Sequence, residues 1–308
     1  MNGRVYKSTG SWYIVKNKPG EEFNARIKGK FKIDDITSTN PLAVGDEVEF
    51  EREETEEGSV VINEIHQRKN YITRQSPHNK HQHHIIAANL DQSLLFATLK
   101  DPKTSRGFID RFLIASEAYH VPAIIVFNKV DLYKKKEFEK LDQITMEYEE
   151  IGYKVLAISL SEKKRIDEVT DLLKDKTTLL SGHSGVGKST FINNIFPEIS
   201  LKTQHVSGWS GKGLHTTTFA EMYDLSFGGK IIDTPGLREF ALMDFEKEEL
   251  SHYFPEMKKL INHCRFNNCM HIEEPGCAVK RAVEEGKISS ERYISYLTIL
   301  DSIGDKEW

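Results

Sequence analysis

Hydrophobic and polar positions alternate in short runs through residues 1–70, which is the two-residue period of β-strands. Turn-forming residues separate the runs, as at Lys18-Pro19-Gly20 and Asn40-Pro41. Five short strands without a helix-period segment between them are typical of a small barrel, and the OB-fold is the expected five-stranded form. The predicted strands are Arg4–Ser8, Ser11–Lys16, Glu22–Ile33, Asp46–Glu53 and Val60–Ile65.

The third of these strands carries a row of cations. Arg26, Lys28, Lys30 and Lys32 alternate with hydrophobic or small residues, so all four side chains are expected on one face of the strand. One interpretation is the solvated outer face of a half-buried strand. The other is a surface that follows the phosphates of RNA, because OB-folds bind oligonucleotides over their second and third strands. Composition alone favours neither.

A polar, histidine-rich connector is predicted over residues 66–84. The segment is basic and has no sustained hydrophobic period, which favours a solvated linker or a loop that touches RNA. A metal site is a third interpretation, although the spacing of the histidines defines no coordination geometry. These histidines are His66, His78, His81, His83 and His84.

From residue 85 the pattern changes to strands that alternate with helices. Such alternation is typical of βαβ units and of a parallel sheet covered on both faces. The predicted strands are Gln92–Thr98, Ala123–Phe127, Val155–Ile158, Thr178–Leu180 and Lys230–Ile232. The predicted helices lie near residues 106–119, 134–151, 162–175 and 188–196.

The strand pattern ends at about Asp244, and helical stretches follow, including an amphipathic helix near residues 289–300. We therefore expect a multidomain α/β protein with an OB-fold over residues 1–70, an α/β domain over residues 71–242 and a helical domain over residues 243–308. The length of 308 residues agrees with two or three domains.

Residues 182–189 read Gly-His-Ser-Gly-Val-Gly-Lys-Ser and match the phosphate-loop pattern G-x-x-x-x-G-K-[ST] between a predicted strand and a predicted helix. The glycines let successive backbone N–H groups surround phosphate oxygens at a helix N-terminus. Lys188 is expected to reach the β- and γ-phosphates, and Ser189 to ligate Mg²⁺. The nucleotide-binding candidates of this loop are Gly182, Ser184, Gly185, Val186, Gly187, Lys188, Ser189 and Thr190.

Asn128-Lys129-Val130-Asp131 follows the strand Ala123–Phe127 and matches the motif N-K-x-D. The Asp131 carboxylate can accept hydrogen bonds from the two donor groups on the edge of guanine, whereas adenine has the opposite donor pattern and leaves that charge unpaired. The aliphatic stem of Lys129 can cover the base. By itself the turn could be an ordinary strand-to-helix cap, but beside a phosphate loop it predicts that the nucleotide is GTP.

Asp233-Thr234-Pro235-Gly236 follows the predicted strand Lys230–Ile232. Asp233 can hold the Mg²⁺ shell, and the Gly236 amide can meet the γ-phosphate. Upstream, a glycine-rich segment leads into three successive threonines, of which Thr217 is the preferred second Mg²⁺ ligand beside Ser189. Thr216 and Thr218 remain alternatives for that role.

The chain has three cysteines, all within residues 264–277. An odd number in so short a window is unsuited to a disulfide framework, and buried free thiols would not explain their position beside a histidine. Three thiolates and one imidazole suit tetrahedral zinc in a closed, structural site. The predicted ligands are Cys264, Cys269, His271 and Cys277, with His263 as a less favoured alternative.

Several cations flank this predicted zinc site. One interpretation is a surface that contacts RNA, and an equal interpretation is a set of solvating charges. The flanking cations are Lys258, Lys259, Arg265, Lys280 and Arg281.

The composition excludes global disorder, because hydrophobic residues make up 38% of the chain and charged residues 29%. The net charge of −5 argues against a protein coated in positive charge but does not exclude a local RNA-binding surface. The longest apolar run, Val121–Phe127, is far below the ~18 residues of a membrane span, and the N-terminus has no signal-peptide pattern. We expect a cytoplasmic protein without a membrane partner.

The order of the motifs is unusual. N-K-x-D comes first, Ala157-Ile158-Ser159 follows and adds Ser159 to the GTP-binding candidates, and the phosphate loop comes later, whereas ordinary small GTPases begin with the phosphate loop. A parallel sheet can rebuild the same site from a permuted chain. This order, the segment Ile86–Gln92, the threonine-rich switch and the cysteine cluster together resemble the RsgA/YjeQ family over essentially the whole chain.

The resemblance implies an N-terminal OB-fold, a circularly permuted GTPase domain, a C-terminal domain with one structural zinc ion, and a role in late maturation of the bacterial small ribosomal subunit. Its expected partners are that subunit and its RNA, and the chain is expected to be a monomer. GTP, GDP and Mg²⁺ are the expected cofactors beside zinc.

Leu237 occupies the position after D-x-x-G at which many GTPases have a glutamine that orients the attacking water. His215, beside the switch threonines, is the nearest candidate for that role, and the resemblance indicates the same histidine. An exposed loop residue without a catalytic role is the alternative. Slow basal turnover is expected until the ribosomal subunit orders the segment.

Two other functions compete with a GTPase that acts on the ribosome. One is a signalling or transport GTPase with protein partners, and the other is a zinc-stabilised RNA-binding protein in which GTP is only structural. Binding to purified small subunits, and its dependence on nucleotide, separates the three.

Overall fold

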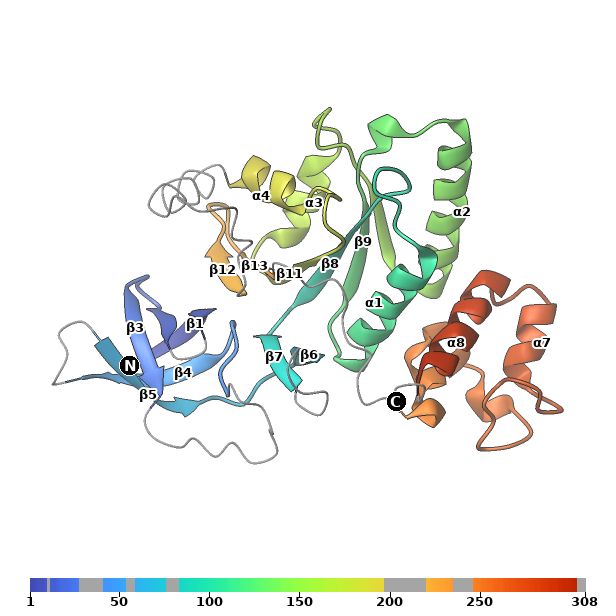
Figure 1. Ribbon diagram of the computed structural model, residues 1–308, viewed down its shortest axis with the longest axis horizontal. Coiled ribbons are helices and arrows are strands. Elements are labelled where there is room, and N and C mark those ends of the chain that lie inside the picture. Colours follow the sequence, from blue (N-terminus) through green and yellow to red (C-terminus); the bar gives the residue numbers. More distant parts are fainter. Residues whose placement is uncertain are drawn as a thin grey trace.

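The computed structural model describes residues 1–9, 12–27, 41–53, 59–75, 83–196, 220–234 and 246–303. Within these ranges the chain forms a β-barrel, a central α/β domain and a helical C-terminal region (Figure 1). Among these residues no helix is both long enough and apolar enough to span a bilayer.

Five strands close the N-terminal barrel in the order β1-β2-β3-β5-β4, with β1 paired to β4. Alternate side chains fill it, and Val5, Val15, Ala25, Phe50 and Ile62 are fully buried. The predicted five-stranded barrel is confirmed. Its strands are β1 (Asn2–Ser8), β2 (Tyr13–Asn17), β3 (Glu22–Ile27), β4 (Glu47–Arg52) and β5 (Ser59–Ile65).

The central sheet has the order β10-β9-β8-β11-β13-β12. Its first five strands are parallel, as predicted, and β12 pairs antiparallel with β13 at the edge. The short strand β12 was not predicted, because only Met222 of its four residues is buried and the others are polar or half-exposed. The strands are β8 (Gln92–Ala97), β9 (Ala123–Phe127), β10 (Lys154–Ala157), β11 (Thr177–Ser181), β12 (Glu221–Asp224) and β13 (Lys230–Asp233).

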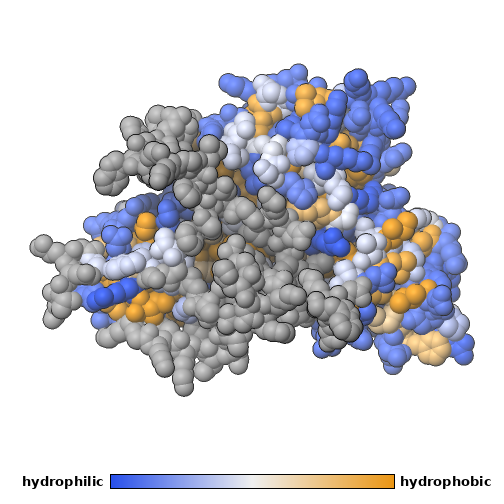
Figure 2. All heavy atoms as spheres, in the orientation of Figure 1, coloured by the Kyte–Doolittle hydropathy of each residue, from blue (hydrophilic) through white to orange (hydrophobic). Residues whose placement is uncertain are grey.

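Helices cover both faces of this sheet, which explains why β8 is buried at every position. Leu95 and Ala97 belong to the hydrophobic cluster under the helices Arg106–Ala118 and Lys135–Ile151. Leu94 and Phe96 belong to the cluster under the helices Ile166–Leu173 and Lys188–Ile195 on the other face. Figure 2 shows mostly hydrophilic residues over the outer surface of the helix Lys135–Ile151, labelled α2 in Figure 1. The first pair is α1 (Arg106–Ala118) and α2 (Lys135–Ile151), and the second is α3 (Ile166–Leu173) and α4 (Lys188–Ile195).

The barrel joins the central sheet through its first strand. Lys7 of β1 pairs with Glu221 of β12, so that barrel and sheet share one set of strands. The Asp224 carboxylate accepts hydrogen bonds from Tyr6 Oη at 2.7 Å and Lys16 Nζ at 2.8 Å, both from the barrel. The barrel therefore covers this edge of the central sheet and shields β12 from solvent.

The prediction of an irregular connector over residues 66–84 is wrong in part. Strands β6 (Tyr71–Gln75) and β7 (His83–Ala88) pair there as an antiparallel hairpin. Ile72 and Ala87 lie in the main core cluster although the flanking sequence is polar. Asn70 fixes the end of the hairpin, because its Nδ2 donates to Leu90 O at 2.9 Å and its Oδ1 accepts from Leu90 N at 2.8 Å. Of the connector's histidines, His78 and His81 lie outside the described residues.

Short helices form the C-terminal region and pack around their own core, which includes Leu250, Phe254, Tyr296 and Ile299. Ile114 of α1 belongs to the same cluster, so this region is docked on the central domain. The predicted amphipathic helix is confirmed as α8. The elements are η2 (Lys247–Tyr253), α6 (Pro255–Lys258), η3 (Ile261–His263), α7 (Ala278–Glu284) and α8 (Ser290–Ser302).

A buried arginine of α8 joins this region to the central domain. Arg292 and Asp110 of α1 are both 0% exposed, and Arg292 Nη1 donates to Asp110 Oδ1 at 2.5 Å. Arg292 Nε donates to Glu256 Oε1 at 2.8 Å, and Tyr148 Oη donates to Asp110 Oδ1 at 2.7 Å. The guanidinium thus holds carboxylates from α1 and α6 together inside the protein.

Candidate functional site

The phosphate loop turns tightly from β11 into α4 because three of its glycines have backbone angles that other residues disfavour. The φ angles are +134° at Gly182, +81° at Gly185 and +109° at Gly187. A Cβ atom at Gly182 would lie 2.3 Å from Phe96 O, and one at Gly187 would lie 2.3 Å from Asn128 Nδ2. The pattern of glycines therefore follows from close packing as well as from the turn.

Lys188, the first residue of α4, is held across the loop. Its Nζ donates to Gly182 O at 2.5 Å and to His183 O at 2.9 Å. Burial lowers the pKa of this ammonium, and the Asp233 carboxylate opposes that shift. The cation is thus held where phosphate oxygens would meet the loop amides.

Asp233 ends β13 and pairs with Leu180 of the neighbouring strand β11, which places it beside the start of the phosphate loop. Burial raises the pKa of its carboxyl, and the Lys188 ammonium works against that rise. A carboxylate here and the Ser189 hydroxyl on α4 are hard oxygen donors, the kind that Mg²⁺ binds beside nucleotide phosphates. The residues present fit a magnesium ion.

The N-K-x-D turn lies directly against the phosphate loop. Asn128, only 2% exposed, donates from Nδ2 to Val186 O at 2.8 Å, and its Oδ1 accepts from Leu160 N at 3.3 Å. These contacts join residues from the carboxyl ends of β9, β10 and β11, which is the edge of a parallel sheet where ligands bind. Motifs far apart in the permuted chain therefore form one site.

Asp131 is oriented by a buried serine. Ser159 Oγ donates to Asp131 Oδ1 at 2.6 Å, and this hydrogen bond lowers the pKa of the exposed Asp131 carboxyl. The ionised group is then available to accept from a base that offers two donors, as guanine does. Ser159 thus holds the Asp131 carboxylate of the N-K-x-D turn in one orientation.

Sequence analysis missed three contacts of this site, because no motif indicates them. Lys129 Nζ donates to Asp101 O at 2.5 Å, and the Phe108 ring of α1 stacks on the His183 ring of the phosphate loop with centroids 3.8 Å apart. Tyr133 Oη donates to Asn128 O at 3.1 Å. These are backbone-directed or ring contacts across the fold, which no local spacing in the sequence reveals.

Several predicted site residues lie outside the described residues. They are His215, Thr217 and Gly236 of the predicted nucleotide site and Lys28, Lys30 and Lys32 of the strand predicted over Glu22–Ile33. Arg26, the described member of that strand's cations, forms an ion pair with Glu53 and is 44% exposed.

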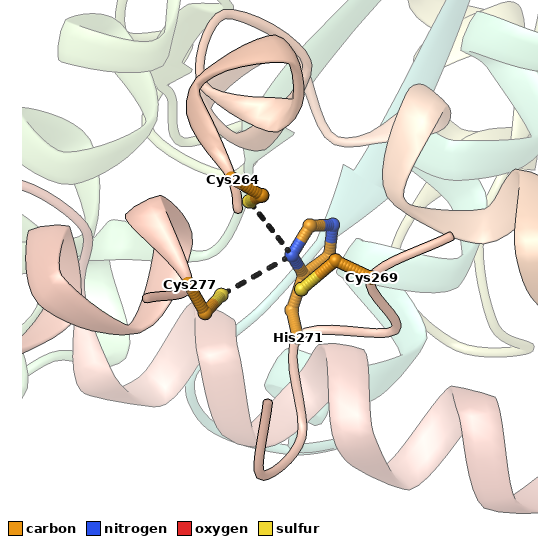
Figure 3. A group of neighbouring side chains, drawn as sticks. All are labelled: Cys264, Cys269, His271 and Cys277. Carbon is orange, nitrogen blue, oxygen red and sulfur yellow. Dashed lines mark hydrogen bonds between the residues drawn. The ribbon is translucent and has the colours of Figure 1, made fainter. Parts of the chain in front are cut away.

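The four predicted zinc ligands meet in the C-terminal region (Figure 3). Their ligand atoms all lie within 4.8 Å of one another, and the His271 Nδ1 is 3.3 Å from Cys277 Sγ and 3.7 Å from Cys264 Sγ. His271 is 1% exposed, whereas its competitor His263 is exposed and outside the cluster. The predicted ligand set Cys264, Cys269, His271 and Cys277 comes together in space.

The chemistry of this cluster suits zinc. Burial lowers the pKa of the His271 imidazole, which favours the neutral form that has a lone pair to offer a metal. Backbone N–H groups of Ala278 and Lys280 lie 3.4 Å from Cys264 Sγ and Cys277 Sγ, where they stabilise thiolates. Four ligands fill a tetrahedral shell, which is typical of a structural site.

His271→Ala is expected to abolish stoichiometric zinc binding and to unfold the C-terminal region, because structural zinc contributes about 10 kcal/mol or more to the folding of such small sites. Zinc content by atomic absorption and the thermal unfolding curve measure the two effects. The matched control is His263→Ala, which should keep one zinc per chain. Full zinc content in the His271 variant would remove this histidine from the ligand set.

Together the barrel, the permuted order of the motifs and the zinc cluster define a circularly permuted GTPase with a zinc-binding C-terminal domain. Residues 65–243 match the RsgA GTPase family, and residues 2–60 match the RsgA N-terminal domain. The chain therefore belongs to the RsgA family, and it is a GTP-hydrolysing enzyme that uses GTP, Mg²⁺ and a structural zinc ion.

Similar proteins and solved structures match this chain over nearly its full length. The small ribosomal subunit biogenesis GTPase RsgA of Flavobacterium psychrophilum is 53% identical over 100% of this chain and 94% of that protein, and the Christiangramia forsetii protein of the same name is 50% identical over 99% and 97%. The structure of YjeQ from Thermotoga maritima superposes with a TM-score of 0.79 at 34% identity, covering 98% of this chain and 97% of the other. YloQ, described as a circularly permuted GTPase, gives 0.75 at 30% identity over 100% and 96%.

Proposed function

We propose that this GTPase acts on the small ribosomal subunit in a late maturation step, binds the subunit in the GTP form and leaves it after hydrolysis to GDP and phosphate. The contact of Asn128 with Val186 carries the nucleotide part of the proposal, because it joins the guanine-reading turn to the phosphate loop. The names of the relatives support the ribosomal part.

The residues of the nucleotide site receive their roles from the geometry above and from the motifs. The loop amides and Lys188 hold the phosphates, Asp131 reads guanine, and the Gly236 amide meets the γ-phosphate. Ser189 and Thr217 would hold Mg²⁺, with Asp233 in its shell, and the bound ion would supply positive charge beside the phosphates. The other GTP-binding residues in this assignment are Asn128, Lys129, Ser159, Gly182, Ser184, Gly185, Val186, Gly187 and Thr190.

His215 is assigned the task of positioning the attacking water, since Leu237 follows the D-x-x-G motif and has no polar side chain. A histidine on the switch segment has to be placed by a partner before it acts, so basal turnover is slow. The partner in this proposal is the small subunit.

The domain division at residues 70 and 242 and the cation row predicted from the sequence belong to the same proposal. Arg26, Lys28, Lys30 and Lys32 are assigned to a surface that contacts ribosomal RNA, which is supported by the barrel fold and by the outward, 44% exposed position of Arg26. The protein acts as a monomer in the cytoplasm, where ribosomal subunits mature.

GTP turnover measured with and without purified small subunits tests the proposal. Wild type should be stimulated at least about tenfold, and His215→Ala should lose that stimulation and keep its affinity for GTP. The matched control is His120→Asn, an exposed histidine remote from the nucleotide, which should behave as wild type. Turnover of wild type that small subunits leave unchanged, together with an RNA affinity that does not depend on nucleotide, would instead favour a zinc-stabilised RNA-binding protein in which GTP is only structural.

A further inference from the structure

A row of three charged side chains connects the barrel to the magnesium site. Lys7 of β1 is the direct partner of Glu221 of β12, and Glu221 is the direct partner of Asp233 of β13. Residues directly opposite in antiparallel strands put their side chains on the same face of the sheet. A cation of the barrel, a glutamate of the edge strand and the aspartate proposed for the Mg²⁺ shell therefore lie side by side.

The contacts within the row show that the charges act on one another. Lys7 Nζ is 3.2 Å from Glu221 Oε2, and both side chains are about 30% exposed, at 31% and 28%. Direct partners in antiparallel strands have Cβ atoms about 4.5–5.5 Å apart, so the Glu221 side chain lies beside that of Asp233. Glu221 is thus close enough to Asp233 to influence a cation bound there.

We propose that Glu221 adds negative charge beside the Mg²⁺ site and that Lys7, supplied by the barrel, offsets it, so that docking of the barrel on β12 sets the affinity of the GTPase for Mg²⁺. The proposal rests on the assignment of Asp233 to the metal shell. Glu221 and Lys7 are positioning residues in this account, because neither touches the nucleotide.

A second ion pair between barrel and β12 provides an internal comparison. Lys16 Nζ lies 2.8 Å from Asp224 Oδ2, at the other end of the same strand. Asp224 pairs in register with Lys230 rather than with Asp233, and Lys230 Nζ is 3.5 Å from its Oδ1. Loss of Lys16 therefore removes a barrel cation from β12 without exposing a new charge to the metal site, while Tyr6 Oη still donates to Asp224 and keeps the barrel docked.

The test measures the free Mg²⁺ concentration that half-maximally slows release of a fluorescent GDP analogue. GDP is chosen because it has no γ-phosphate for Glu221 to repel. Lys7→Met should lower that concentration about fourfold and Glu221→Gln should raise it about fourfold, as expected for one charge acting on a divalent cation at partly screened range. The double variant should return close to wild type, and Lys16→Met should stay within twofold of it.

The opposite changes in Mg²⁺ requirement expected for Lys7→Met and Glu221→Gln distinguish an electrostatic role of this pair from a purely structural one. If the pair served only to dock the barrel, removing either partner would shift the Mg²⁺ requirement in the same direction, and that result or two unchanged values would overturn the proposal. Asp233→Asn should lose most of the Mg²⁺ dependence. If it does not, the metal assignment itself fails, whereas stimulation by small subunits tests the rest of the proposed function separately.

Discussion

Asp131→Asn is expected to change the preferred base from guanine to xanthine. The wild-type carboxylate accepts two hydrogen bonds from guanine, and an amide can accept only one and would present a donor in place of the other acceptor. Loss of a charge-assisted pair should lower GTP affinity about 100-fold, while affinity for XTP rises because its extra oxygen accepts from the new amide. Competition of each nucleotide against fluorescent GDP measures both changes.

The change of preference from guanine to xanthine is a more specific test of base recognition than the loss of GTP affinity. The Ser159 hydroxyl still has the Oδ1 atom of the new asparagine to donate to, so the turn should keep its shape. Asp142→Asn, an exposed carboxylate of α2, is the matched control and should bind GTP as wild type does. An Asp131 variant with unchanged GTP affinity would show that this carboxylate does not read the base.

Arg292→Met is expected to destabilise the zinc-loaded protein by about 3–5 kcal/mol, because it removes the cation between two carboxylates and leaves them without a counter-charge in the interior. Asp110 is 0% exposed and Glu256 is 10% exposed, so water cannot replace the guanidinium without opening the interface between α1 and α8. The free energy of unfolding from denaturant titration measures the loss.

The exposed ion pair of Arg165 and Glu168 provides the control for this prediction. Arg165 donates to both oxygens of Glu168 at 2.6 and 2.8 Å, but the two side chains are 44% and 48% exposed. Arg165→Met should therefore cost no more than about 1 kcal/mol. Equal destabilisation by the two substitutions would mean that the buried network does not hold the C-terminal region on the central domain.

Much of the central domain follows from local pattern. The run Ala123–Phe127 is continuously apolar and short, which is how a strand buried on both faces appears, and it leads into N-K-x-D as expected. The phosphate loop was predictable for a related reason, since its glycines and Lys188 are required by the chemistry of phosphate binding. The cysteine cluster could be predicted because soft ligands at short spacing have few other uses.

Contacts that depend on distant parts of the chain were not predictable. Ser159 has no local signal that it orients Asp131, because the two residues meet only when β9 and β10 pair. The hairpin β6–β7 was missed although Ile72 and Ala87 are buried, because its strands are short, the sequence between them is polar, and its packing comes from the central domain. The register of Lys7, Glu221 and Asp233 likewise exists only once barrel and sheet have docked.

The central claim is that the permuted motifs form one pocket selective for guanine nucleotides. Isothermal titration calorimetry of the zinc-loaded protein with GDP and with ADP, each with Mg²⁺, tests it most directly. The account predicts one GDP bound per chain and at least about 100-fold weaker binding of ADP, whose base leaves Asp131 without donors. Comparable binding of the two nucleotides, or no binding of GDP, would contradict it.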